Sequence, residues 1–386
     1  MLKKYQLRSY NFRLVAILLI TSVYALSIVN SANSSYTLKQ GVGIAAAFIV
    51  MIAVSFIDFN FITKYYWVWY LLGVLMLLAV LFFGVSSHGA QRWIKIGPVQ
   101  VQPSEFVKII LIIFTAKVIA MNKNRLNTWK FLVTLGIVLM IPIFLIFKEP
   151  DMSTTLLIVL IVLTVIFCAG LSYKIIGVSL LVIVPLVAGF LIYIINVPDP
   201  IIIEKYQRNR IVDFINGRNN TDTDATDSGN YQQDYAVQAV GSGQLSGKGL
   251  NNADSSSLKN AGYIAEAQND FIFAVIGEEL GFVGCIFTII LLFTIVIECI
   301  ITAVRAVNFE GRLICCGIAA YIGFQMFINI GVVTKLLPNT GLPLPFFSCG
   351  LASIMALFIA MGLVLNISLQ RKVDSDDDMF AEDFRG

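Results

Sequence analysis

The most constraining feature of this chain is a series of ten apolar runs, each long enough to cross a lipid bilayer. A hydrocarbon core of about 30 Å requires roughly 20 helical residues, and lipid offers backbone groups no other partners, so each crossing must be a helix. Only 13% of the residues are charged. The sequence therefore predicts an all-α polytopic membrane protein with ten transmembrane helices, at 13–31, 41–57, 65–84, 104–121, 129–147, 152–170, 174–196, 272–303, 312–335 and 347–369.

Basic residues gather on one side of the predicted membrane. With a cytoplasmic N-terminus, the inner segments hold fifteen lysines and arginines, whereas the short outer loops hold only Lys39, Arg92, Lys95, Lys148 and Lys335. The positive-inside rule then predicts a multi-pass protein of the cell (cytoplasmic) membrane with both termini in the cytoplasm. The net charge of +3 is small and gives no surface for binding nucleic acid.

Composition divides the chain into a membrane domain, an outer loop and a tail. We expect 1–386 to form one membrane domain, with 197–269 as a large extracytoplasmic loop between spans 7 and 8 and 371–386 as an acidic cytoplasmic tail. Within the loop, 204–216 and 235–250 mix apolar, aromatic and basic residues, as segments lying on the outer membrane surface do. The residues between them are typical of a linker.

Asp270 stands at the outer mouth of the run 272–303, where an unpaired carboxylate is costly. If the helix includes Asp270, one face also carries Ala274, Gly277, Gly281 and Gly284. This stripe of small residues could pack against another helix, with Asp270 as the N-cap. It could instead leave room for a bulky substrate beside the carboxylate. Glu278 and Glu279 lie off this stripe, and we expect them to orient or cap the same helix.

Two further outer segments combine polar residues with unusual backbone. In "QPSEFVK" (102–108), Glu105 and Lys108 are three residues apart, so they share one helix face and can pair. For either residue alone, a helix start with a snorkelling lysine is the plainer explanation. The prolines and glycines of "KLLPNTGLPLPFFSCG" (335–350) cannot continue a helix. At membrane depth such a break must be buried in protein or line a wet cavity.

Eight motifs in order resemble the SEDS family (shape, elongation, division and sporulation) of peptidoglycan polymerases. They are "GAQRW" (89–93), "QPSEFVK" (102–108), "EPDMSTT" (149–155), "YQRNRI" (206–211), "YQ" (231–232), "GSGQLSGKGL" (241–250), "NDFIFAVIGEELGFVG" (269–284) and "PNTGLPLPFFSCG" (338–350). They extend over nearly the whole chain, which resembles a single SEDS-type domain closer to the RodA than to the FtsW branch. Departures from the family pattern include Gln268 and Asn269, where a His-Thr pair is usual, and Cys349 in place of a Tyr.

The resemblance implies a glycosyltransferase that polymerises lipid II into glycan strands for cell-wall elongation or division. Asp270 would be the general base on the acceptor 4-hydroxyl, and undecaprenyl pyrophosphate would be the leaving group. We expect burial to raise the pKa of Asp270. A divalent cation such as Mg²⁺ would suit the leaving group, although no metal ligands can be read. The residues expected to bind substrate are Glu105, Lys108, Arg92, Arg210, Lys248 and Ser348.

The expected partners are membrane lipid, lipid II and a class B penicillin-binding protein, the transpeptidase that cross-links the strands. Two other functions stay open: a lipid II flippase, because transporters also combine many helices with broken segments, and a non-enzymatic scaffold for a cell-wall synthase. The acids cluster at one face and no inverted repeat is obvious, which disfavours the flippase. The outer carboxylate disfavours the scaffold.

Overall fold

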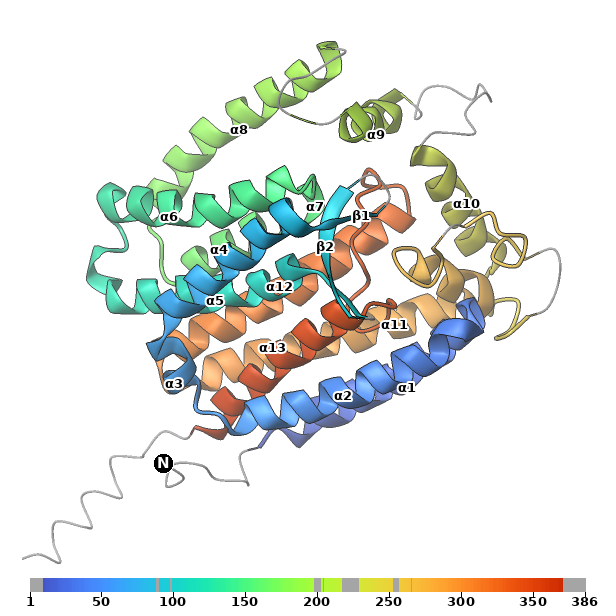
Figure 1. The fold of residues 1–386 in the computed structure, drawn as a ribbon, viewed down its shortest axis with the longest axis horizontal. Helices are drawn as coiled ribbons and strands as arrows, with labels where there is room; N and C mark the ends of the chain where they lie inside the picture. The colour runs from blue at the N-terminus through green and yellow to red at the C-terminus, as the bar shows by residue number, and fades with distance from the viewer. Residues whose placement is uncertain are drawn as a thin grey trace, which may run out of the picture.

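The computed structural model describes residues 10–87, 90–97, 99–197, 203, 205–216, 229–252, 257–264 and 266–370. Most of these residues lie in long helices that run side by side (Figure 1). All the expected apolar runs form helices, with bounds within four residues of those expected. They are α1 (Phe12–Ala32), α2 (Thr37–Phe56), α4 (Tyr66–Phe83), α5 (Pro103–Met121), α6 (Trp129–Lys148), α7 (Met152–Cys168), α8 (Tyr173–Asn196), α11 (Ile272–Arg305), α12 (Phe309–Val333) and α13 (Leu351–Leu369).

Eight helices in the described part of the chain are long and apolar enough to cross a membrane. The two long helices outside this group are α5, which carries Glu105, Lys108 and Lys117, and α7, which has 17 residues. Most of α5 is buried inside the bundle, so its sequence need not match a lipid-facing helix, whereas α7 is apolar and only shorter than the others. The protein is therefore a helical membrane protein with multiple spans.

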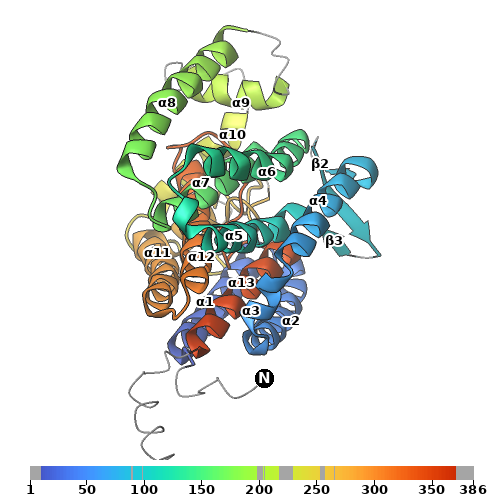
Figure 2. The same cartoon turned by 90° about the vertical axis from the view of Figure 1, so that its left-hand side faces the viewer.

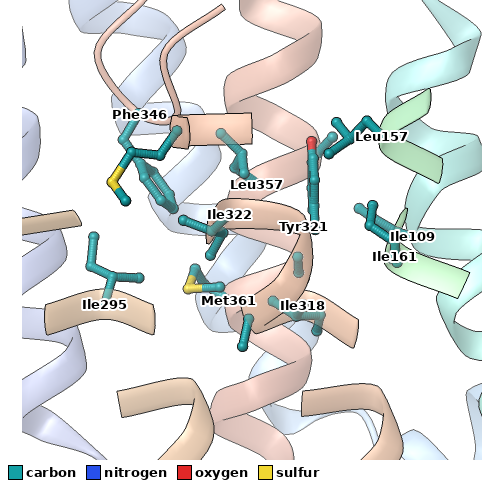
Figure 3. Packing of buried hydrophobic residues seen from close by; sticks show 14 of the residues in the cluster. Ile109, Leu157, Ile161, Ile295, Ile318, Tyr321, Ile322, Phe346, Leu357 and Met361 are labelled. Atoms are coloured by element: carbon teal, nitrogen blue, oxygen red, sulfur yellow. The ribbon is translucent and has the colours of Figure 1, made fainter. Parts of the chain in front are cut away.

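The core lies where α12 and α13 pass through the bundle. Tyr321 and Ile318 of α12 pack beside Leu357 and Met361 of α13, all buried (Figure 3). Ile109 of α5 and the α7 residues Leu157 and Ile161 close the other side of Tyr321. Dispersion contacts of this kind hold helices together in lipid, where little apolar surface is removed from water.

Short elements not expected from the hydropathy pattern lie at the two ends of the bundle. A three-stranded antiparallel sheet, β1 (Val85–Ser87), β2 (Ala90–Ile96) and β3 (Val99–Val101), joins α4 to α5. It lies at the end opposite α3 (Phe59–Lys64) (Figure 1). The 3-10 turns η2 (Ser34–Tyr36) and η3 (Lys123–Arg125) complete the connections.

The segment expected as an outer loop contains two helices, α9 (Lys205–Asn216) and α10 (Gly229–Ser242). α8 stands away from the bundle and meets α9 at one end (Figures 1 and 2). α10 packs on α11, burying Ala236 and Ala239. Its apolar content therefore serves protein packing as well as any membrane contact. The middle of the expected linker, 217–228, and the acidic tail, 371–386, lie outside the described residues.

Candidate functional site

Asp270 lies in a turn just before α11 and is not part of the helix. α11 begins at Ile272, and its N-cap is Phe271, with no side-chain cap. The alternative that Asp270 is an N-cap is therefore wrong. The turn is fixed from α12, because the buried Asn329 amide donates to the Asp270 carbonyl at 2.8 Å and to the Leu342 carbonyl at 2.7 Å. The Asp270 carboxylate is left to face the surrounding segments.

The loop 335–350 is bound to this turn by hydrogen bonds to main-chain carbonyls of the turn. The Ser348 hydroxyl donates to the Asn269 carbonyl at 2.6 Å and accepts from the Leu344 N–H at 2.7 Å. The Cys349 N–H donates to the Gln268 carbonyl at 2.9 Å. Gly341 has φ +71°, and a Cβ there would lie 3.2 Å from Asp270 Oδ2. The predicted helix break is thus buried in protein, and it forms one wall beside Asp270.

Four other charged side chains act on Asp270: Arg92, Asp151, Arg210 and Glu266. We call these five residues the Asp270 cluster. Burial raises the pKa of Asp270 to about 6, with Glu266 and Asp151 adding to the rise and the two arginines opposing it. The direction and the main cause agree with the expectation. A carboxylate with this pKa is largely ionised at neutral pH and is a stronger base than an exposed Asp.

Each arginine that acts on Asp270 belongs to a different element. Arg92, on β2, has Nη1 3.7 Å from Asp151 Oδ1. Asp151 is the N-cap of α7, accepting from the Thr154 N–H at 3.1 Å. Arg210, on α9, donates to the Asn339 carbonyl at 3.3 Å in the loop 335–350. β2 and α9 therefore contribute two cations, from separate parts of the chain, that act on one carboxylate.

Glu105 and Lys108 form the expected ion pair, at 2.8 Å, but inside the bundle. Both are buried, with Tyr321 donating to Glu105 at 3.3 Å and the Lys108 ammonium 4.5 Å from the centre of the Tyr321 ring. Lys108 also contacts Gln325 at 3.4 Å, and Gln325 donates to the Pro343 carbonyl at 2.8 Å. The pair is thus linked to the loop 335–350 through Gln325, and it does not reach the surface.

Lys248 is used in a second polar network, which the two glutamates of α11 organise. Lys248 pairs with the fully buried Glu278 at 2.8 Å, and Glu278 also accepts from the Leu258 N–H at 2.8 Å. Lys259 pairs with Glu279 at 2.5 Å. These acids hold the outer loop onto α11, which is a different role from the expected orientation or capping of the helix. Lys248 is part of this anchor, and no described contact joins it to Asp270.

Two glycines of the small-residue stripe on α11, Gly277 and Gly281, pack against the same outer segment, at Val240 and at Leu245 with Gly247. Gly281 has non-helical φ and ψ of 62° and −158°, so α11 is broken there. The Lys248 and Gly249 N–H groups donate to the Glu278 and Glu279 carbonyls at 3.0 and 2.9 Å. The Phe282 N–H donates to the Gln244 carbonyl at 2.8 Å. Close packing explains these glycines, and room for a substrate at Gly281 does not, because a Cβ there would lie 2.4 Å from the Gly247 nitrogen.

Sequence reasoning did not nominate Glu149, Asp151, Glu266 or Asn329. Glu149 and Asp151 stand in "EPDMSTT", whose place at the outer ends of two spans was the available signal. Within the described residues, no group of three or more His, Cys, Asp or Glu side chains could hold a metal ion. The described residues thus do not form a complete protein ligand set for the expected Mg²⁺.

Comparisons with known proteins show the family and the fold of this chain. Residues 4–373 match the family model described as cell cycle protein, FtsW/RodA/SpoVE. Peptidoglycan glycosyltransferase MrdB of Escherichia coli K12 is 32% identical over 370 residues, 93% of this chain and 94% of that protein. Probable peptidoglycan glycosyltransferase FtsW of Nitrosomonas europaea is 37% identical over 308 residues, 78% and 74% of the two chains. Relatives of both names match, so the RodA branch stays a prediction.

Solved structures share the fold. One, described as "Structural coordination of polymerization and crosslinking by a peptidoglycan synthase complex", gives a TM-score of 0.78 at 23% identity, covering 95% of this chain and 99% of that chain. The rod shape determining protein RodA of Thermus thermophilus gives 0.67 at 22% identity, covering 95% and 98%. Because the family model covers almost the whole sequence, the chain belongs to the FtsW/RodA/SpoVE family of cell cycle proteins.

Proposed function

We propose that this protein is a peptidoglycan glycosyltransferase that polymerises lipid II at the outer face of the cytoplasmic membrane. One observation carries the proposal: Asp270, with a pKa of about 6, lies among two arginines at one end of a membrane bundle. A general base is most effective when its pKa is near the working pH. The names of the relatives support the same reaction.

In this proposal, Asp270 accepts the proton of the acceptor 4-hydroxyl as that oxygen attacks the anomeric carbon of the donor sugar. The carbon–oxygen bond to the pyrophosphate breaks, and undecaprenyl pyrophosphate leaves with the electron pair. Arg92 and Arg210 stabilise the negative charge that develops on the leaving group. Asp151 holds Arg92 in place through the 3.7 Å ion pair.

The remaining nominated residues act through the loops in this proposal. Ser348 fixes the loop 335–350 to the Asp270 turn, and Glu105 with Lys108 supports that loop through Gln325. Lys248 secures the outer loop to α11 through Glu278. All four residues are therefore proposed to position the site, and the two arginines to contact the lipid-linked substrate.

We also propose the membrane arrangement of this SEDS-type domain. The long helices make ten crossings with both termini in the cytoplasm, so that 197–269 and the Asp270 cluster face outward. The similar solved structure of a peptidoglycan synthase complex supports a partner, which we propose is a class B penicillin-binding protein. Polymerisation and cross-linking would then occur at the same membrane face.

The decisive experiment incubates purified protein with lipid II and resolves glycan chains on a gel. Asp270→Asn keeps the side-chain volume but removes the proton acceptor, so it should lower polymerisation by about 10²-fold or more. Asp58→Asn is the matched control, because Asp58 caps α3 at the other end and Asn caps a helix equally well. A parental rate for Asp270→Asn would show that Asp270 is not the base. No glycan from the parent, with or without its transpeptidase, would favour the flippase or the scaffold.

A further inference from the structure

Glu149 is a buried acid next to the Asp270 cluster to which the proposed reaction gives no role. It follows α6 directly, and its N–H donates to the carbonyls of Leu145 and Ile146, each at 3.1 Å. Only 1% of Glu149 is exposed. Among the described residues, neither of its carboxylate oxygens has a hydrogen-bond partner. Buried polar atoms are nearly always paired, so this side chain requires an explanation.

The neighbouring cation is engaged with other groups. Arg92 donates from Nε to the Glu149 main-chain carbonyl at 3.3 Å and from Nη2 to the Pro150 carbonyl, while Nη1 faces Asp151. The guanidinium therefore holds the main chain of the α6–α7 turn and the Asp151 carboxylate. The ammonium of Lys148, the preceding residue, lies 5.7 Å from the centre of the Phe144 ring. The charged groups that act on Glu149 are Asp151 and Arg92.

The balance of charges in the site favours an uncharged Glu149. The Asp270 cluster already sets three acids against two arginines, and an ionised Glu149 would add a fourth acid. A buried carboxylate without a hydrogen-bonded partner is strongly unfavourable. Burial raises the pKa of Glu149 to about 8, Asp151 raises it further, and Arg92 opposes the rise. Glu149 is thus mainly a neutral acid at neutral pH.

We infer that Glu149 is a positioning residue that acts in its uncharged form and keeps Arg92 directed to Asp151 and the pyrophosphate leaving group. Ionised Glu149 would attract the Arg92 guanidinium away from Asp151. It would also add negative charge beside the position where the pyrophosphate becomes more negative as it leaves. Glycan synthesis should therefore decline as pH rises through about 8. This effect on activity rests on the proposed function, whereas the state of Glu149 can be measured without it.

The stability of the protein reports the same ionisation. The pKa of Glu149 in the folded protein lies above its ordinary value of 4.5, so between these values the native state binds more protons than the unfolded state. This group therefore makes the folded state less stable as pH rises through that interval. Glu149→Gln removes the dependence. Its unfolding temperature should exceed that of the parent by a margin that grows from about pH 5 to about pH 8 and then levels off.

The test follows lipid II polymerisation and thermal unfolding of purified parent, Glu149→Ala and Glu149→Gln across this pH range. Glu149→Ala should lower activity at every pH by roughly tenfold, because the turn loses its side chain. Glu149→Gln has the shape of the neutral acid and should restore most of the activity near neutral pH and keep it at about pH 9. Glu298→Gln, at a buried acid bonded to Asn11, should leave the pH profile of the parent unchanged.

Three results would overturn the inference. A folded but inactive Glu149→Gln would show that the ionised carboxylate is needed. An alkaline decline in Glu149→Gln equal to that of the parent would assign the decline to another group. If the parent makes no glycan, the proposed function fails, but the unfolding temperatures still decide: a parent–Gln difference that does not change with pH would exclude a neutral Glu149.

Discussion

At the scale of single residues, the acids of this chain divide into Asp270, which we propose is the base, and acids with structural contacts. Asp270 was predictable because a carboxylate at the mouth of an apolar run requires a reason to be there. The roles of Glu278 and Glu279 were not predictable, because their lysine partners lie 30 and 20 residues away in an irregular loop. Asp151 was missed because an acid at the start of a helix ordinarily needs no further explanation. Glu149 was missed because the sequence does not show that the turn after α6 is buried.

The pH dependence of Asp270 gives a prediction at this scale. A base must be ionised, so activity should rise with pH through about 6. Glu266 raises the pKa of Asp270, and Glu266→Gln should therefore move this rise to lower pH, by roughly one unit or less. The measurement is the initial rate of glycan synthesis against pH. A rise that moves to higher pH in Glu266→Gln would contradict the assignment of the base.

At the scale of elements, most helix bounds follow from hydropathy, whereas the break in α11 does not. Gly281 stands in an apolar run whose hydropathy pattern continues on both sides of it without interruption. Only the contact with residues 244–249 shows why the helix breaks there. The strands around Arg92 are short, and α9 and α10 are much less apolar than the spans, so the ten-span pattern carried little sign of them. These elements depend on tertiary contacts more than on local propensity.

Gly281→Ala should destabilise the protein by about 1–3 kcal/mol, because an L side chain rarely adopts this backbone conformation and the Cβ would meet the loop. Gly189→Ala is the matched control, since Gly189 in α8 has no atom near its Cβ position and regular helix favours Ala. Thermal unfolding in detergent measures both. Equal unfolding temperatures for the two variants would mean that the break tolerates a side chain.

The buried pair of α5 should behave as a unit. Glu105→Gln or Lys108→Met alone leaves a buried charge without its partner and should cost about 3–5 kcal/mol. The double variant should cost less than the sum by about 0.5–3 kcal/mol. The more exposed pair of Asp234 and Lys335 is the control, with losses of about 1 kcal/mol or less. Additive losses at Glu105 and Lys108 would show that the two residues act separately.

At the scale of the whole molecule, the outer loop is divided between parts that carry contacts and a part that connects them. We expect shortening within 219–227 to preserve activity, because it joins α9 to α10 without belonging to either helix. Deletions within 205–216 should abolish activity by removing Arg210 from the Asp270 cluster. Deletions within 243–249 should lower the unfolding temperature. Equal loss across all three segments, measured by polymerisation and unfolding, would contradict this division.

The joint between α11 and residues 244–249 also has a consequence for biosynthesis. The loop precedes α11 in the chain, so in the proposed orientation it is exported before that helix enters the membrane. The backbone N–H and carbonyl groups left unpaired by the break at Gly281 can then form hydrogen bonds with residues 244–249, which are already on the outer side. A chain with the order of loop and helix reversed would have to insert a broken helix with unpaired backbone in lipid. In the proposed orientation, the order of these segments along the sequence therefore favours the insertion of α11.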